Sequence, residues 1–149
     1  MLASNFLKHH IDTSVLVEPE NTEDGRICKR YLQKINYNFY GVLSFPVLGE
    51  LFMILSKFED FNDRYDFIES VLATIRSRDI KFYAARNIGN LLNNIEAIDS
   101  RIDYTDMEIM ACACEDACHS LVTLDKDMLN NKKLETFLGI KILHPREFL

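Results

Sequence analysis

Apolar positions recur along the chain with two different spacings, and these spacings alternate along its length. Short apolar runs predict strands over residues 6–12, 40–44, 80–84, 120–124 and 140–143. Apolar residues three or four positions apart predict helices over 21–36, 45–58, 61–79, 85–98 and 104–117, with shorter helical pieces at 126–130 and 133–139. Strands that alternate with helices favour an α/β fold, in which a parallel sheet is covered by helices on both faces.

Residues at the starts of three predicted helices support these boundaries. Asn21 or Thr22 can cap the first helix, and Pro46 lies in the first turn of the second, where its missing N–H costs nothing. Thr105 followed by Glu108 matches a capping box, which predicts the start of the last long helix.

Length and composition predict one soluble domain, residues 1–149. Apolar residues make up 48% of the chain and charged residues 27%, and no apolar run approaches the roughly 20 residues that cross a bilayer. The segment MLASNFLKHH lacks the apolar core and cleavage site of a signal peptide, so we expect a cytoplasmic location. The net charge of -6 argues against a protein that coats nucleic acid. It does not exclude an enzyme acting on nucleic acid, because metal-binding carboxylates themselves add negative charge.

The four cysteines, at positions 28, 112, 114 and 118, allow two interpretations. The segment CACEDACH, residues 112–119, suggests a metal cluster that ends in Cys118 and His119, but its spacing differs from the C-x-x-C pairs of zinc sites. Residues two apart lie on different faces of a helix, so Cys112 and Cys114 do not bridge easily. Buried, reduced thiols are the favoured interpretation.

Four acidic residues lie in or beside apolar segments. Asp12 and Asp125 each follow a predicted strand, and the carboxyl ends of parallel strands share one edge of a sheet, where active sites gather. Glu50 interrupts the apolar run VLGELFMIL, and Asp106 lies in the first turn of its helix. Each acid has a structural alternative when taken alone, such as a helix-dipole contact, a turn cap or a satisfied core position. Four like charges at one edge, however, would repel each other unless a cation neutralised them.

The chemistry of such a carboxylate cluster is that of a metal-dependent nuclease. Oxygen ligands select hard cations, Mg²⁺ or Mn²⁺. Two such ions about 4 Å apart can generate a hydroxide and stabilise the leaving oxygen of a phosphodiester. This chemistry needs neither histidine nor cysteine.

Four segments of the sequence resemble motifs of the PIN-domain family, which includes the VapC-type toxin ribonucleases. They are IDTSVLVE at 11–18, LGELFMIL at 48–55, DMEIMACA at 106–113 and LVTLDKDM at 121–128. The third is similar to the family's D-x-x-I-x-A-x-A helix, with Met110 where alanine is common. The fourth is similar to its T-x-D-x-D-F segment, with Met128 in place of phenylalanine. The order and spacing of the motifs match over nearly the whole chain.

The resemblance implies a three-layer α/β/α domain with a central parallel sheet, and an acidic pocket that holds Mg²⁺ or Mn²⁺ and hydrolyses single-stranded RNA. It carries over as metal-binding and catalytic acids Asp12, Glu50, Asp106 and Asp125. It also carries over Asp127 as a variable extra metal-binding acid, and Ser14 and Thr123 as residues that support the pocket by hydrogen bonds. It further implies a homodimer and, for toxin members, a small antitoxin protein that blocks the pocket.

Two features depart from the family pattern or compete with it. The family's first strand is strongly apolar, whereas here it carries Lys8, His9 and His10. We interpret these three as solvated residues at an exposed strand entry, with contact to RNA phosphates as the alternative. Asp103 competes with Asp106 for the third acidic position, but the D-x-x-I-x-A-x-A frame favours Asp106 and leaves Asp103 a loop or supporting role.

Two basic regions are candidates for RNA contact. In the segment RSRDIKFYAAR, residues 76–86, four basic residues surround Phe82 and Tyr83, and bases stack on aromatic rings in single-strand tracks. The structural alternative places both aromatic residues in the core or in an interface. Arg101 is the second candidate.

Three functions are weighed on this basis. The leading hypothesis is a metal-dependent endoribonuclease, either a toxin or an RNA-processing enzyme. The second is a catalytically inactive PIN-like module for RNA binding or scaffolding, which the presence of all four acids disfavours. The third is a flavodoxin-like or phosphoryl-transfer domain, whose late lysine is matched by neither Lys126 nor Lys141.

Overall fold

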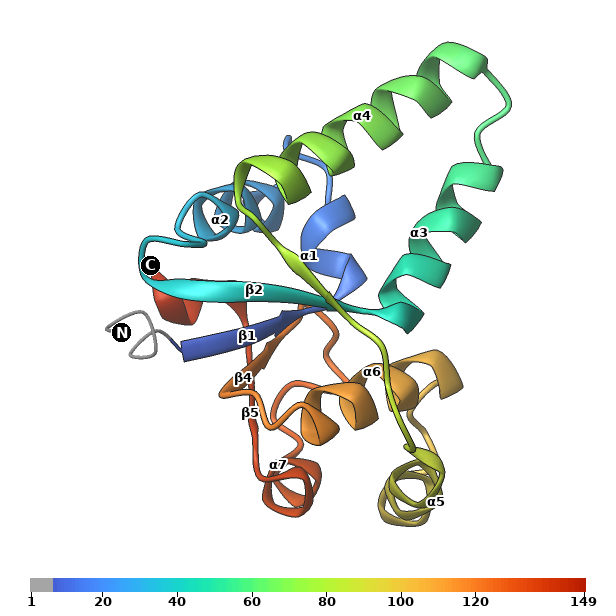
Figure 1. The fold of residues 1–149 in the computed structure, drawn as a ribbon, viewed down its shortest axis with the longest axis vertical. Helices are drawn as coiled ribbons and strands as arrows, with labels where there is room; N and C mark the ends of the chain where they lie inside the picture. Colours follow the sequence, from blue (N-terminus) through green and yellow to red (C-terminus); the bar gives the residue numbers. More distant parts are fainter. Residues whose placement is uncertain (1–6) are drawn as a thin grey trace.

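The computed structural model describes residues 7–149 (Figure 1). Its strands are β1 (Leu7–Ile11), β2 (Phe39–Ser44), β3 (Lys81–Tyr83), β4 (Ser120–Val122) and β5 (Lys141–Leu143). Its helices are α1 (Thr13–Val17), α2 (Glu23–Leu32), α3 (Phe45–Ser56), α4 (Phe61–Ser77), α5 (Gly89–Ile98), α6 (Tyr104–Glu115) and α7 (Lys132–Leu138), and the 3-10 helix η2 (Pro145–Phe148) follows β5.

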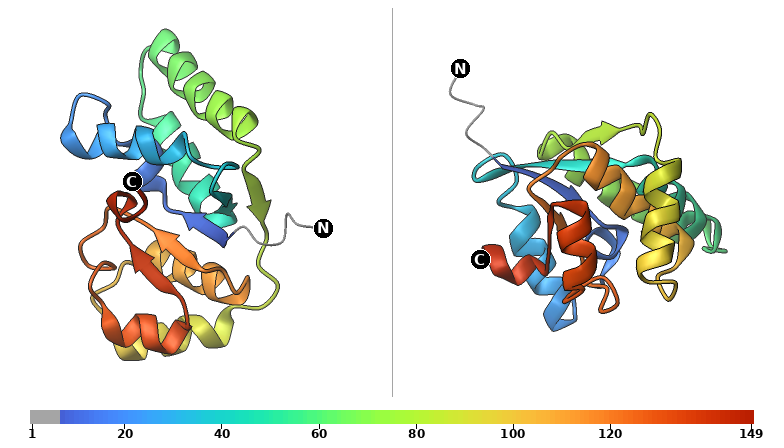
Figure 2. Two further views of the ribbon diagram at one scale, coloured as in Figure 1. Left: turned by 90° about the vertical axis from the view of Figure 1, so that its left-hand side faces the viewer. Right: turned by 90° about the horizontal axis from the view of Figure 1, so that it is seen from below.

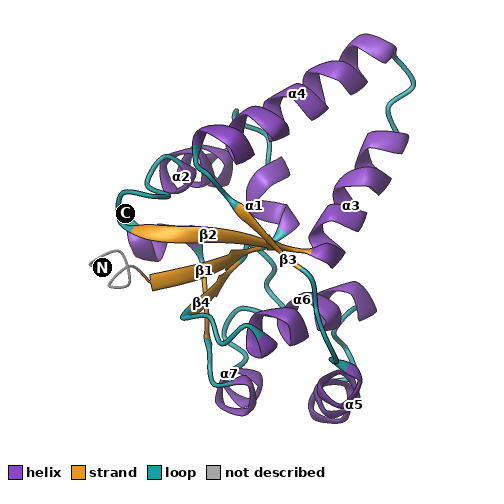
Figure 3. Ribbon diagram, viewed as in Figure 1, coloured by secondary structure: helices purple, strands orange, loops and turns teal. Residues whose placement is uncertain are grey.

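The strands form one sheet in the order β3-β2-β1-β4-β5, and every neighbouring pair is parallel, so β1 is the central strand. Helices α1, α2 and α4 lie on one face of the sheet, whereas α5, α6 and α7 lie on the other (Figure 3). The two views of Figure 2 agree on the second group, in which α6 contacts both α5 and α7. The predicted three-layer α/β/α architecture with a parallel sheet is therefore confirmed.

One apolar core joins the three layers. Ile11, Leu43 and Leu121 are buried on the strands, Met110 is buried on α6 and Leu134 on α7. The core continues into α3 and α4, which extend from the sheet as two arms (Figure 1). Among the described residues, no helix combines the length and apolar character that a membrane span requires.

The predicted order of long helices and strands is confirmed, and the differences concern short segments. Phe6, the first residue of the predicted strand 6–12, lies outside the described residues, as does most of the segment considered for a signal peptide. The predicted helical piece 126–130 is a turn, because the Asp125 carboxylate accepts two backbone N–H groups within it. The short helices α1 and η2 were not predicted.

One predicted helix cap is confirmed and another is wrong. Thr22 caps α2 by accepting a hydrogen bond of 2.9 Å from a backbone N–H. Helix α6 begins at Tyr104, with Asp103 in the N-cap position and no side-chain hydrogen bond there. Thr105 is already inside the helix, so the capping box with Glu108 does not form. The extended backbone of Asp103 ends the preceding loop two residues earlier than the pattern predicted.

The polar residues of β1 are not solvated at a strand entry, and this prediction is wrong for both histidines. His9 and His10 are each 1% exposed, because β1 lies between β2 and β4. Hydrogen bonds of 2.8 Å join His9 Nδ1 to the Tyr31 hydroxyl and His10 Nε2 to the Asp116 carboxylate. Lys8 pairs with the other oxygen of Asp116 at 3.0 Å. Burial lowers the pKa of His9 to about 3 and also lowers the pKa of His10, so both rings are neutral at pH 7.

All four cysteines are free thiols, and Cys114 is less buried than the other three. Burial raises the pKa of Cys28, Cys112 and Cys118 to about 12. These thiols therefore stay protonated and act as small apolar groups in the core.

Candidate metal centre

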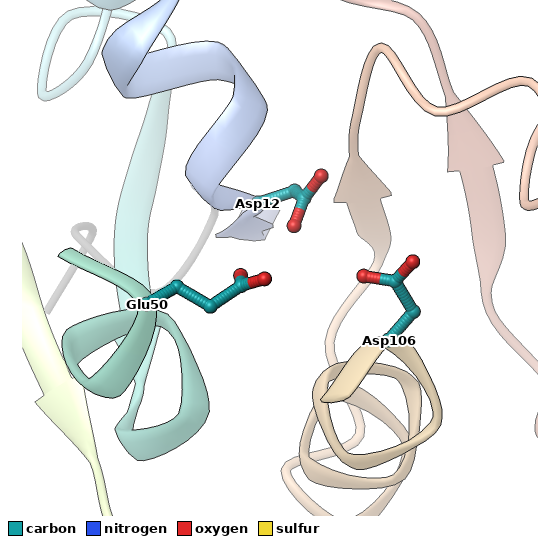
Figure 4. Close-up of side chains that lie close together, drawn as sticks. All are labelled: Asp12, Glu50 and Asp106. Atoms are coloured by element: carbon teal, nitrogen blue, oxygen red, sulfur yellow. The ribbon is translucent and has the colours of Figure 1, made fainter. Parts of the chain in front are cut away.

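Three carboxylates from distant parts of the sequence meet at the carboxyl edge of the sheet (Figure 4). Asp12 follows β1 and precedes α1, Glu50 lies on α3, and Asp106 lies in the first turn of α6. One oxygen of each side chain lies within 4.8 Å of one oxygen of each of the others. We call these three residues the acidic triad.

Asp12 is fixed in place by hydrogen bonds from three directions. Its backbone N–H donates to Val122 O of the neighbouring strand at 2.9 Å. Its Oδ2 accepts hydrogen bonds from the hydroxyls of Ser14 and Thr123, both at 2.7 Å. The Ser14 hydroxyl also accepts the N–H of Leu124 at 3.1 Å, which ties α1 to the segment after β4. The carboxylate is therefore held by the two residues that the motifs named as supporting groups.

Glu50 has its own positioning residue, which the sequence analysis did not single out. Thr13 donates a hydrogen bond of 2.5 Å from its hydroxyl to Glu50 Oε1. Thr13 is buried and positions Glu50, and the next residue, Ser14, positions Asp12. Two consecutive residues therefore position two members of the triad. The hydroxyl of Thr13 within the Asp-Thr-Ser motif is the signal that could have identified it.

Burial raises the pKa of every member of the acidic triad above its ordinary value, and the charges of neighbouring carboxylates add to this effect. Burial, followed by the charges of Asp12, Asp125 and Glu50, raises the pKa of Asp106 to about 7. Burial also raises the pKa of Asp12, although the hydrogen bonds from Ser14 and Thr123 act in the opposite direction. Burial is likewise the main cause that raises the pKa of Glu50. No lysine or arginine of residues 7–149 forms an ion pair with the triad.

The other predicted acids lie beside the triad rather than in it. Asp125 is half-buried, and its charge raises the pKa of all three members. One of its oxygens is already committed to the turn after β4, where it accepts the N–H groups of Asp127 and Met128. Asp127 is exposed, and its charge acts on Arg101. Asp103 is exposed at the start of α6, and its charge contributes to the raised pKa of Asp106.

The donor set of the acidic triad fits a divalent metal ion. Carboxylate oxygens are the ligands that hard cations such as Mg²⁺ and Mn²⁺ take up. Three buried or half-buried carboxylates without a counter-charge are costly, and a divalent cation bound among them would relieve the repulsion. Among the acids, cysteines and histidines of residues 7–149, the acidic triad is the group whose ligand atoms lie close enough together to hold one ion. It contains no cysteine.

The basic and aromatic residues of the segment 76–86 do not gather at the triad. Lys81 pairs with Asp79 at 2.8 Å, and Phe82 lines an apolar groove between α3 and α4. The Tyr83 hydroxyl donates to Glu115 at 2.6 Å. Glu115 is the last residue of α6, at the opposite end of this helix from Asp106. The segment therefore contacts the far end of the helix that carries the third acid.

Comparison with known proteins gives matches to solved structures only, since no family model and no curated protein matches the sequence. VapBC2 from Rickettsia felis, bound to a DNA fragment from its promoter, is 20% identical with a TM-score of 0.67, over 93% of this chain and 98% of the other. FitAcB from Neisseria gonorrhoeae is 16% identical with a TM-score of 0.66, over 92% of this chain and 97% of the other. VapBC-5 from Mycobacterium tuberculosis, a member of a family of toxin–antitoxin systems, is 18% identical with a TM-score of 0.61, over 93% and 98%.

These identities are low, so the likeness is one of fold. It extends over almost the full length of both chains in each comparison. The resemblance of the four sequence motifs implied this three-layer α/β/α fold with a parallel sheet. The chain has the fold of the PIN-domain family.

Proposed function

We propose that the protein is a metal-dependent endoribonuclease that hydrolyses phosphodiester bonds of single-stranded RNA. The observation that carries this proposal is the acidic triad, whose carboxylate oxygens lie within 4.8 Å of one another without a cationic partner among the described residues. Such an arrangement is costly for folding, and it is the arrangement that a metal-dependent hydrolase needs.

The acids have different tasks in this proposal according to their position. Asp12, Glu50 and Asp106 hold the metal ion, and Asp125 completes the acidic site from the turn after β4. Asp127 is proposed as an additional acid at its rim. When bound, Mg²⁺ or Mn²⁺ activates a water molecule and stabilises the leaving oxygen of the phosphodiester.

The hydroxyl residues orient the acids. Ser14 and Thr123 both donate to Asp12 Oδ2 and so fix the orientation of its carboxylate. Thr13 donates to Glu50 Oε1 and fixes the rotamer that brings Glu50 toward Asp12. These bonds hold the acids in place before any ion or substrate arrives, which lowers the cost of assembling the site.

We further propose that the protein acts as the toxin of a toxin–antitoxin pair. VapBC-5 from Mycobacterium tuberculosis, whose fold this chain shares, is a member of a family of toxin–antitoxin systems, and this supports a small antitoxin protein as partner. A homodimer and a cytoplasmic location belong to the same proposal.

The proposal is tested by incubating a mixed pool of single-stranded RNA with the protein, with and without Mn²⁺. We expect cleavage only with the metal, and loss of cleavage in Asp12→Asn, whose circular dichroism spectrum should stay that of the parent. Asp66→Asn, an exposed position on α4, is the matched control and should cleave like the parent. Undiminished cleavage by Asp12→Asn would overturn the assignment. A parent protein that neither cleaves RNA nor binds Mn²⁺ would favour an inactive RNA-binding or scaffold module.

A further inference from the structure

A shallow hollow at the turn after β4 and the start of α7 is rich in positively charged residues. It has a volume of about 330 Å³, and its lining includes Arg101, Lys126, Asp127, Asn131, Lys132 and Lys133. We call it the basic hollow. Four of these residues are cations and one is an acid, although the whole chain carries a net charge of -6.

The backbone that presents the basic hollow is held firmly. The turn after β4 begins at Asp125, whose carboxylate accepts two N–H groups of the turn, and Met128 anchors it in the core at 0% exposure. Asn130 adopts a φ of 63°, a left-handed conformation that asparagine tolerates. Asn131 then caps α7 and donates from its side-chain amide to Asp99 at 3.0 Å. Lys126 is therefore displayed on an ordered turn, and Lys132 and Lys133 lie in the first turn of α7.

Two of the four cations are not neutralised. Arg101 makes a two-pronged ion pair with Asp99, with both contacts at 2.9 Å. Lys132 pairs with Glu135 at 3.2 Å. Lys126 and Lys133 are exposed, and among residues 7–149 neither has an ion pair or hydrogen-bond partner. Their charges are available to an anion in the hollow.

The turn that contributes Lys126 to the basic hollow is linked to the acidic triad by hydrogen bonds. The Asp125 N–H donates to the Thr123 hydroxyl at 3.0 Å, and this hydroxyl donates to Asp12 Oδ2 at 2.7 Å. Lys126 directly follows Asp125, whose charge raises the pKa of Asp12, Glu50 and Asp106. A nucleic-acid strand carries a phosphate at each nucleotide, and the negative triad alone would repel it. Positive charge next to the triad would attract the phosphates beyond the cleavage point, and Lys126 on the turn after β4 and Lys133 on α7 supply it.

We propose that single-stranded RNA leaves the acidic triad across the basic hollow, with Lys126 and Lys133 contacting phosphates of the strand next to the cleaved bond. This inference rests on the proposed ribonuclease function and adds the direction of the substrate to it. The surface at 76–86, with its paired Lys81 and its groove-lining Phe82, is not part of this path.

Binding of single-stranded RNA separates this proposal from a general charge effect. Lys126→Gln with Lys133→Gln is compared with Arg30→Gln with Lys57→Gln, which removes the same charge from exposed positions on α2 and at the end of α3. Both pairs are made in the Asp12→Asn background, so that the RNA stays intact. Fluorescence anisotropy is measured over a range of salt concentrations.

We expect the hollow pair to bind RNA about tenfold more weakly, and the slope of log K against log salt to fall by about 1.4, since each phosphate contact in a single strand contributes about 0.7. The control pair should change both quantities far less. Equal affinity and slope for the hollow pair and its Asp12→Asn parent would overturn the proposal. Equal losses for the two pairs would overturn it as well.

Cleavage by proteins with the wild-type triad gives a second readout. The hollow pair should raise KM about tenfold and leave kcat within about twofold, because the lysines hold the strand and do not touch the reacting atoms. A fall in kcat with an unchanged KM would contradict this role. If the wild-type protein failed to cleave in Mn²⁺, the ribonuclease proposal would fall, while the binding measurement would still decide whether the hollow holds RNA.

Discussion

The two ends of β1 both bury polar side chains, but only one end neutralises them. At the amino-terminal end, Asp116 pairs with Lys8 and accepts from His10, and neutral His9 bonds to the Tyr31 hydroxyl. Every charge there has a partner of opposite sign within the chain. At the carboxyl end, three carboxylates converge with no such partner among the described residues.

The difference separates polar groups that serve the fold from those that serve a site. A buried charge that is paired and hydrogen-bonded costs far less than an unpaired one, whereas like charges in contact destabilise the fold. The fold therefore tolerates repulsion between unpaired carboxylates at the carboxyl end of β1, whereas the charges at the amino-terminal end are paired. A divalent ion is the simplest species that would make the two ends equivalent.

The largest expected effect comes from substituting the acids at the two ends of α6 and comparing the results. This helix carries Asp106 in its first turn, and Asp116 comes just after its last residue. Asp106→Asn should lower Mn²⁺-dependent cleavage about a thousandfold, or about 4 kcal/mol in activation free energy, and should abolish the rise in Tm on adding Mn²⁺. Asp116→Asn should keep cleavage within about twofold but lower the free energy of unfolding by about 1–3 kcal/mol. RNA cleavage rates and thermal melts with and without Mn²⁺ test both variants. A similar loss of cleavage in the two would show that the ends do not differ in function.

The second prediction concerns the paired end alone. Tyr31→Phe removes a fully buried hydroxyl and leaves His9 Nδ1 without its partner, while His9 Nε2 already has none among the described residues. We expect a loss of about 1–3 kcal/mol in the free energy of unfolding, measured by urea denaturation, with cleavage unchanged. Tyr37→Phe, at a position that is 72% exposed, is the control and should change stability by less than about 0.5 kcal/mol. Equal stability of Tyr31→Phe and the parent would contradict the structural role of this bond.

The sequence predicted the acidic end of β1 far better than the paired end. The order of elements follows from local periodicity, and a parallel sheet brings the ends of its strands to one edge, so the sequence alone places Asp12 and Asp125 together. The four motifs added Glu50 and Asp106. The arrangement of these acids depends on topology and on contiguous motifs, both of which leave clear signals in a sequence.

The environment of His9 and His10 depends on strand order and on partners distant in sequence. Nothing local in Lys8–His10 indicates that β1 is the central strand, and a strand with three polar residues is typical of an edge. Asp116 and Tyr31 complete the polar groups only after the fold brings them close. The bond from Thr13 to Glu50 was missed for a similar reason, because it depends on how α3 is placed against α1.

The third prediction uses pH to compare the two ends. The pKa of Asp106 is raised from an ordinary value of 3.8 to about 7, so between these values the folded protein binds a proton that the unfolded chain has released. Its contribution makes the metal-free protein less stable as pH rises through this window. The lowered pKa values of His9 and His10 act in the opposite sense, since the stability they provide is present above about pH 6.5 and is lost as pH falls.

The difference between Asp106→Asn and the parent isolates the first contribution, because both proteins keep the histidines. We expect the free energy of unfolding of Asp106→Asn, relative to the parent, to increase by about 1–2 kcal/mol between about pH 5 and about pH 8, after allowing for solvent screening of this half-buried group. Urea denaturation in the presence of a chelator measures it at each pH. A difference that does not depend on pH would mean that Asp106 titrates like an ordinary surface acid.

The smallest expected effect tests whether the acidic end is held as firmly as the paired end. Ser14→Ala removes one of the two hydroxyls that donate to Asp12 Oδ2, and that hydrogen bond lowers the pKa of Asp12 against the effect of burial. We expect cleavage near neutral pH to fall about fivefold, and the acidic limb of the pH–rate profile to move to higher pH, since Asp12 then needs a higher pH to ionise. Ser70→Ala, at an exposed position on α4, should leave both quantities unchanged. A drop in rate without movement of the profile would show that Ser14 shapes α1 and does not act through the charge of Asp12.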